Sequence, residues 1–352
     1  MFQTFIFLSL LSKFNGDRSS SAIFHLLKGK QTAQTIQDGY IYHVHPFFKT
    51  GSYLTREEAN HVVDSLKSSG LIVEEQTKCW LSEKGKAELK KLEERYTIPE
   101  GLNGFEVGSV SEVFWQRLTL VIHTLSHLVH EVKHYMTLST DRLLLDWGKQ
   151  FFLTSPYNRT ELSEKLYQEL FRLIGSRPPL QRTLLVHRLS GFKKEGVSLD
   201  QFAYLLEKEK VELIFILKAA LQGSVTALLE DSSSYPLLSQ LLENTDVGRM
   251  TKSAEETYYW FNKGLNLEQL AAKRHLKLST IQDHIVEIAR VCPKEVKERY
   301  LTEALSKQIG TILRTYPTRR LSELKKQLPE EVSYFNIRLC LAIEEGEGVS
   351  NA

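Results

Sequence analysis

Apolar residues recur every three or four positions along most of the chain, which is the spacing of helices that bury one face. The main departure is a pair of short apolar runs, residues 71–73 and 79–81, which lie between turn-forming residues and predict two strands. The pattern therefore predicts a mainly α-helical, multi-domain chain with one small β element.

The segment 55–92 is predicted to form a winged helix. Thr55 and Glu58 have the spacing of a capping box, in which each side chain bonds a free backbone group of the first helical turn. The helix that follows ends at Ser69–Gly70, and the two extended runs and another helix start at Ser82 come after it. This order resembles the wing region of winged-helix proteins, and it leaves both DNA contact and protein contact open.

A helix-turn-helix is predicted near the C-terminus. A helix over 255–261 is followed by a second helix in 265–276 and by a third helix that starts at Ser279, the predicted N-cap. A short turn at Lys277–Leu278 separates the last two helices. The side chains predicted to face the core are Leu267, Leu270, Ala271, Ile281, Ile285 and Ile288. Ala271 is small enough to let the two helices cross closely.

The turn between these two helices is basic, and this suggests contact with DNA. If the third helix enters a major groove, its first residues approach base edges while the cations before it hold phosphates. The residues expected at phosphates are Lys273, Arg274, His275 and Lys277. Those expected near the bases are Ser279, Thr280 and Gln282.

Two acidic residues, Asp283 and Glu287, are predicted to share the presumed reading face of the third helix. Negative charge there opposes the approach of phosphates, so the pattern favours backbone contact through the basic turn over base reading. A helix-turn-helix that binds protein remains an alternative. Because the formal net charge is only +2, any affinity for phosphate must come from such a local patch.

Four histidines lie at helical spacing in the middle of the chain: His123, His127, His130 and His134. Neighbouring pairs at this spacing can hold one metal ion. Zinc sites usually draw ligands from several elements, however, and the segment has neither an H-E-x-x-H motif nor a cysteine cluster. We therefore expect a polar helix face and no metal, with these histidines as the only candidate ligands.

The opening run Met1–Leu11 is apolar but too short to span a bilayer, and no basic residue precedes it. We expect it to form a buried first helix. The cysteines Cys79, Cys292 and Cys340 are far apart and include no C-x-x-C pair, which suits a reducing compartment. A cytoplasmic protein without a membrane segment is the expectation.

A chain of 352 residues exceeds the size of one ordinary core. Breaks rich in proline and glycine at 96–104, and loop-forming residues at 231–236 and 244–248, divide it. We predict a winged-helix-like domain over 1–100, a helical domain over 101–245 and a helix-turn-helix domain over 246–346.

The stretch "TYYWFNKGLNLEQLAAKRHLKLSTIQDHIVEI", with "LSELKKQLPEEVSYFNIRLCLA" further on, resembles the helicase helix-turn-helix domain at the C-termini of some bacterial RecQ-type helicases. The positions that carry the resemblance are Thr257, Phe261, Gly264, Leu270, Ala271, Arg274, Leu276, Ser279, Thr280, Ile281, His284, Tyr334, Ile337 and Arg338. The N-terminal "NGDRSSSAIFHLLKGKQTAQTIQDGYIY" resembles the start of the YpbB family of Gram-positive bacteria, which carries the same domain.

This resemblance implies a non-catalytic, DNA-binding accessory of a RecQ-type DNA helicase in DNA repair or recombination. A short helicase that lacks the C-terminal module could receive it from a separate chain, and forked DNA or a single-strand/duplex junction would be the common substrate. The sequence has no G-x-x-x-x-G-K-[ST] loop and no G-x-S-x-G elbow, so we expect neither an enzyme nor a cofactor.

Two other functions remain as alternatives. A helix-turn-helix transcription regulator would use the two possible DNA-binding modules to read an operator sequence. A metal-dependent enzyme built on the histidine helix would contain stoichiometric zinc or iron.

Overall fold

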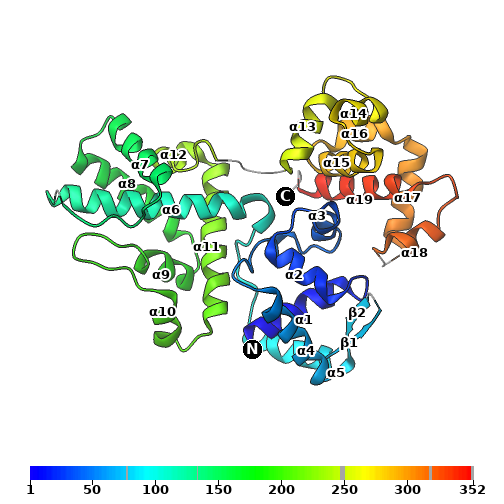
Figure 1. Cartoon of the computed structure of the whole chain (residues 1–352), viewed down its shortest axis with the longest axis horizontal. Coiled ribbons are helices and arrows are strands. Elements are labelled where there is room, and N and C mark those ends of the chain that lie inside the picture. The colour runs from blue at the N-terminus through cyan, green and yellow to red at the C-terminus, as the bar shows by residue number, and fades with distance from the viewer. Residues whose placement is uncertain (77, 133, 246–249, 317–318, 350–352) are drawn as a thin grey trace. The chain divides into compact units, whose positions relative to one another are not determined.

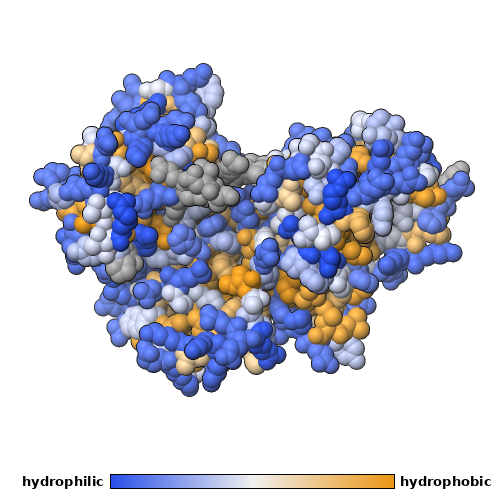
Figure 2. Space-filling model, turned by 180° about the vertical axis from the view of Figure 1, so that it is seen from behind, coloured by the Kyte–Doolittle hydropathy of each residue, from blue (hydrophilic) through white to orange (hydrophobic). Residues whose placement is uncertain are grey.

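The computed structural model describes residues 1–76, 78–132, 134–245, 250–316 and 319–349. Across these residues the chain forms nineteen α-helices, two 3-10 helices and one two-stranded sheet (Figure 1). The predicted mainly α-helical class is therefore confirmed. Polar side chains cover much of the surface shown in Figure 2, with hydrophobic patches between them.

The chain packs into two compact units, each assembled from separate stretches of sequence. One contains Met1–Ser9 and Lys84–Val247, and the other contains Leu10–Glu83 and Gly248–Ala352. The prediction of three consecutive domains is not tested by this division and stays a prediction. Its second boundary, at 245/246, adjoins residues 246–249, which lie outside the described residues.

The first helix, α1, begins at Phe2 and ends at Phe14. Phe2 is buried, and its ring lies against those of Tyr96 and Phe215, with centroids 5.4 and 5.5 Å away. Further along the helix, Leu8 and Leu11 are fully buried. The expectation that the apolar opening run forms a buried helix is confirmed.

The winged-helix order follows in the N-terminal quarter. Its elements are α2 (Ser20–Lys28), α3 (Ala33–Ile41), η1 (His45–Phe47), α4 (Arg56–Ser68), β1 (Ile72–Glu75), β2 (Lys78–Leu81) and α5 (Glu83–Arg95). The capping box of Thr55 and Glu58 starts α4 as predicted, and both of its hydrogen bonds are present. The strands β1 and β2 are antiparallel, with Ile72 opposite Leu81.

The unit that contains residues 84–247 is a helical assembly around one long apolar helix. Its further elements are α6 (Gly104–Val129), α7 (Arg142–Thr154), α8 (Arg159–Gly175), α9 (Pro179–His187), α10 (Leu199–Leu205), α11 (Lys210–Glu230), η2 (Ser232–Ser234) and α12 (Pro236–Gln240). Within the described ranges, α11 alone is long and apolar enough to cross a membrane by length and composition. It contacts α6, α9 and α10 and buries Ala220 and Val225 completely, so it is the core helix of this unit.

The C-terminal region supplies the rest of the other unit. Its helices are α13 (Lys252–Phe261), α14 (Leu267–Arg274), α15 (Leu278–Val291), α16 (Pro293–Tyr300), α17 (Glu303–Thr315), α18 (Leu321–Lys326) and α19 (Tyr334–Val349). The helix α15 lies along α19 and also contacts α3, which comes from the N-terminal part of the chain (Figure 1). Packing therefore joins the helix-turn-helix region to residues far away in the sequence.

Candidate nucleic-acid interface

The predicted helix-turn-helix is present as α14, a short turn and α15. Asn266 caps α14 through a capping box with Gln269, and His275 ends this helix in the left-handed conformation, with φ of 52°. In the hydrophobic contact between the helices, Leu270, Ile281 and Ile285 are completely buried, as predicted.

The start of α15 differs from the prediction by two residues. Lys277, rather than Ser279, occupies the N-cap position, and its side chain makes no capping hydrogen bond. Ser279 lies within the first helical turn instead and is exposed. No capping side chain satisfies the first backbone N–H groups of α15, and such groups at a helix N-terminus attract anions.

The predicted phosphate-contacting residues separate into two groups. Lys273, His275 and Lys277 are exposed around the turn. Arg274 is instead turned toward α13, where its Nη1 atom donates to the carbonyl oxygen of Ser253 at 2.9 Å and to the hydroxyl of Thr257 at 3.0 Å. Because these bonds occupy its guanidinium group, Arg274 holds two helices together rather than facing solvent.

Arg274 belongs to a buried polar network between α13, α14 and α15. It also forms an ion pair with Glu256 at 2.9 Å, and the Thr257 hydroxyl lies 2.8 Å from His284 Nδ1. Burial is the main cause that lowers the pKa of His284, and the charge of Arg274 lowers it further. Both effects favour the neutral form of His284, in which its Nδ1 atom can hydrogen-bond the threonine hydroxyl.

The predicted acidic reading face is not present. Glu287 is 5% exposed and accepts hydrogen bonds from the backbone N–H and the hydroxyl of Thr251, while burial raises the pKa of this carboxyl. Asp283 forms an ion pair with Arg338 and accepts a hydrogen bond from Gln37 Nε2 at 3.4 Å. The two carboxylates bind other elements of the fold, so the expectation that both oppose DNA on an open face is wrong.

Residues 284–289 of α15 are covered on every side, because all six are buried. From the first to the sixth of these residues the helix turns through about 500°, which is more than one full rotation. The covering elements are α13, α14, α16, α19 and α3. Of the predicted base-facing residues, Ser279 is exposed while Thr280 and Gln282 are half-buried, so within residues 278–289 only the start of α15 is open to a ligand.

Sequence reasoning overlooked a pair of aromatic side chains beside this turn. Trp260 is half-buried, and Tyr259 is 55% exposed. Lys273 Nζ lies 4.4 Å from the centroid of the Trp260 ring, and Lys263 Nζ lies 5.5 Å from that of Tyr259. The spacing of Tyr259 and Lys263, one helical turn apart, was the available sequence signal.

The histidine series does not continue along one helix. His123 and His127 lie near the end of α6, His130 is its C-cap residue, and His134 lies beyond. His127 Nδ1 is 2.8 Å from the carbonyl oxygen of His123, and His123 Nε2 is 3.0 Å from that of Met136. Among the residues that the structure describes, no group of three or more histidine, cysteine or acidic side chains is arranged to hold a metal ion.

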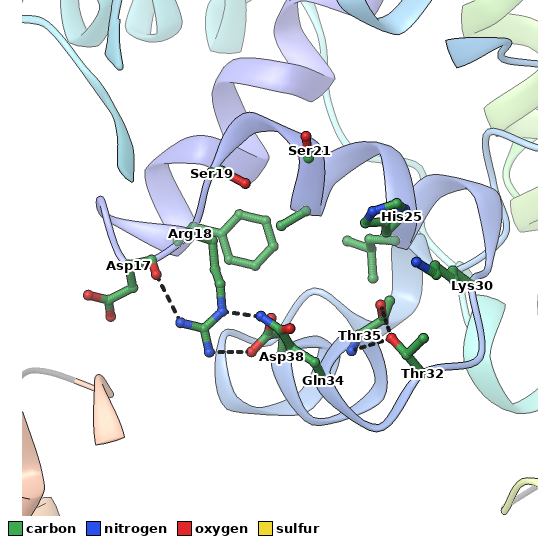
Figure 3. A pocket seen from close by; sticks show the side chains of 13 residues that line it. Asp17, Arg18, Ser19, Ser21, His25, Lys30, Thr32, Gln34, Thr35 and Asp38 are labelled. Atoms are coloured by element: carbon green, nitrogen blue, oxygen red, sulfur yellow. Dashed lines mark hydrogen bonds and ion pairs between the residues drawn. The ribbon is translucent and has the colours of Figure 1, made fainter. Parts of the chain in front are cut away.

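A cavity of about 510 Å³ lies between α2 and α3 (Figure 3). Arg18 and Asp38 lie on one side of it, and His25 and Lys30 lie on the other. Arg18 donates two hydrogen bonds to the Asp38 carboxylate, at 2.7 and 2.6 Å, so these charges neutralise each other. This balance gives the cavity no clear preference for an anion.

Comparison with known proteins finds a family that matches the C-terminal region and a relative that matches nearly the whole chain. Residues 253–341 match the family described as a helix-turn-helix domain. The chain is similar to Protein YpbB of Bacillus subtilis (strain 168), with 26% identity over 337 residues, which cover 95% of each chain. No solved structure matches. The resemblance to the YpbB family with a C-terminal helix-turn-helix domain is confirmed.

Proposed function

We propose that this protein is a non-catalytic DNA-binding accessory of a RecQ-type DNA helicase and acts in repair or recombination in the bacterial cytoplasm. The observation that carries the DNA-binding part is the exposed basic turn of Lys273, His275 and Lys277 before the uncapped start of α15. Side-chain cations and helix N–H groups there can bind neighbouring phosphates. The helicase partnership rests on the resemblance of residues 257–288 and 321–342 to the helix-turn-helix domain at the C-termini of some RecQ-type helicases.

The burial of α15 supports the accessory over the transcription regulator. A regulator reads bases with the N-terminal residues of its recognition helix. Here Thr280 and Gln282 are half-buried and only Ser279 of the predicted base-facing residues is exposed, so few side chains can read bases. Phosphate contacts position a protein on DNA without reading its sequence, which suits a protein that acts on forks or junctions of any sequence.

The charges of the winged-helix region favour a protein partner there. On α4 and β1 the exposed acidic side chains include Glu57, Asp64 and Glu75. Glu74 is not available, since it pairs with Lys67 and accepts a hydrogen bond from the Ser20 hydroxyl at 2.7 Å. The neighbouring α5 exposes basic side chains such as Lys90 and Lys91, so acidic and basic groups balance and the region has no positive patch for phosphates. We therefore assign helicase contact rather than DNA contact to this region.

The double variant Lys273→Glu, Lys277→Glu tests the DNA-binding proposal. We expect affinity for a forked oligonucleotide to fall at least tenfold and the dependence of log Kd on log salt to become shallower by about two, because about one counterion is released per phosphate contact. Fluorescence anisotropy at several salt concentrations measures both quantities.

The matched control is Lys326→Glu, which reverses an exposed charge on α18 of the same unit. It should leave the affinity within about twofold of wild type. Equal affinity of the double variant and the wild type would contradict the proposal and assign the turn to protein contact. The partnership itself is tested by isolating the native protein from cells, where a RecQ-type helicase should co-purify with it.

A further inference from the structure

The structure brings two aromatic rings and two lysines together on the outer side of α13 and α14. The rings of Tyr259 and Trp260 are 5.0 Å apart at 83°, in an edge-to-face arrangement. Lys263 follows Tyr259 by one helical turn, and Lys273, at the end of α14, lies over Trp260. We refer to these four residues as the aromatic-lysine cluster.

The cluster is accessible while the remainder of α13 is packed. Ala254, Thr257 and Phe261 of this helix are buried, which fixes its inner face. Tyr259 points away from that face and leaves 55% of its surface exposed. Tyr259 therefore presents an aromatic ring to solvent next to the half-buried Trp260, where a flat ligand can stack on it.

The charge of the cluster is positive. Neither Lys263 nor Lys273 forms an ion pair with another described residue. Glu256, one turn before Trp260, is an acidic neighbour on α13, but Arg274 neutralises it at 2.9 Å. The two ammonium groups are thus available to an anionic ligand next to an exposed ring.

We propose that the aromatic-lysine cluster binds single-stranded DNA. One base stacks on the exposed ring of Tyr259, and Lys263 and Lys273 neutralise the phosphates on either side of it. Sites that combine aromatic rings with a basic track bind single strands without sequence preference, since every base offers a flat face for stacking. Paired bases in a duplex are already stacked on each other and cannot use the ring.

The position of the cluster connects it to the basic turn. Lys273 belongs to both, and Lys277 follows it by four residues across the turn between α14 and α15. A strand that stacks on Tyr259 would therefore run close to the groups that hold phosphates in the proposed DNA interface. The inference rests on that proposed function and adds the form of DNA, a single strand beside a junction.

The variants Tyr259→Leu and Tyr259→Phe in the full-length protein test the stacking step. Leucine keeps an apolar side chain but removes the aromatic face, so we expect affinity for oligo-dT to fall about tenfold. Phenylalanine keeps the face and should bind within about twofold of wild type. Both variants should retain wild-type affinity for blunt duplex DNA, measured by fluorescence anisotropy.

The control variant is Tyr204→Leu, which makes the same change at a tyrosine that is 85% exposed in the other compact unit. It should not alter the affinity for oligo-dT. A second probe replaces the thymines by abasic sites and so keeps the phosphates without the bases. Wild type should bind this probe about as weakly as Tyr259→Leu binds oligo-dT.

The outcomes separate this inference from the proposed function. If the abasic probe binds as tightly as oligo-dT, or if Tyr259→Leu binds like wild type, stacking is absent and the inference is overturned while DNA binding stands. If neither single-stranded nor duplex DNA binds at all, the proposed function itself fails and the inference fails with it.

Discussion

Polar residues of the helix-turn-helix region stabilise the fold, and one of them, Arg274, was predicted to contact phosphate. Arg274 and His284 both stand at positions of the helix-turn-helix resemblance, yet their side chains meet inside the protein around Thr257. Residue type and spacing predicted that a basic residue ends α14. They could not predict its direction, because a guanidinium group can reach either solvent or the neighbouring helix, and the tertiary contacts decide between them.

The buried histidine makes stability depend on pH. The pKa of His284 is lower in the folded protein than in the unfolded chain, so the unfolded state binds a proton more readily below about pH 6.5. The folded state therefore loses stability as the pH falls through this range. In a His284→Gln variant this loss should be smaller between pH 7.5 and 5.5.

Urea denaturation at the two pH values measures the change in unfolding free energy for each protein. Asp283 and Arg274 also act on His284, and both residues are present in the variant and in the wild type, so the two proteins differ only at position 284. Identical pH dependence of the two proteins would show that His284 does not carry this effect.

At the scale of elements, the sequence predicted the order and type of structure well. The helical period located α14 and α15, and the capping box located the start of α4. The period could not show that α15 is enclosed. Glu287 is acidic and was therefore placed on the open face, whereas in the structure it accepts hydrogen bonds at the start of α13. A hydrogen-bond partner that lies far away in the sequence cannot be inferred from the helical period of apolar residues.

The enclosure of α15 can be tested at Val286, which is 2% exposed. On an open recognition helix this position would tolerate a charge. In the enclosed helix Val286→Glu should lower the unfolding free energy by about 3 kcal/mol or more, because an unpaired carboxylate is buried.

Chemical denaturation of Val286→Glu and of Ser279→Glu gives the comparison. The control substitution lies on the exposed first turn and should change stability by less than about 0.5 kcal/mol. Similar costs at both positions would contradict the enclosed arrangement.

At the scale of the whole molecule, one compact unit contains the winged-helix region from α2 to β2, without α5, together with the helix-turn-helix region. Contacts between α3 and α15 contribute to this unit. Gln37 bonds Asp283, and the guanidinium carbon of Arg290 lies 3.9 Å from the centroid of the Tyr40 ring. Composition breaks in the sequence locate loops and carry no information on which segments pack together, so they could not indicate that residues 10–83 and 248–352 share one unit.

A double-mutant cycle on Tyr40→Leu and Arg290→Leu measures the coupling of these two regions. A cation over an aromatic ring contributes about 0.5–2 kcal/mol, so the two substitutions should be non-additive by about 1 kcal/mol in the unfolding free energy. Additive effects within about 0.3 kcal/mol would show that the contact contributes no coupling.

The packing of residues 10–83 with residues 248–352 in one unit also affects how the protein is made. At about 5–20 residues per second, a ribosome releases residues 10–83 on the order of ten seconds or more before it synthesises 248–352. During that interval α15 has not yet been synthesised and cannot cover α3. The apolar surface of α3 is therefore open to chaperones and to aggregation. A messenger truncated before α15 would therefore yield a product that cannot complete this unit, and the cell's proteases should remove it quickly.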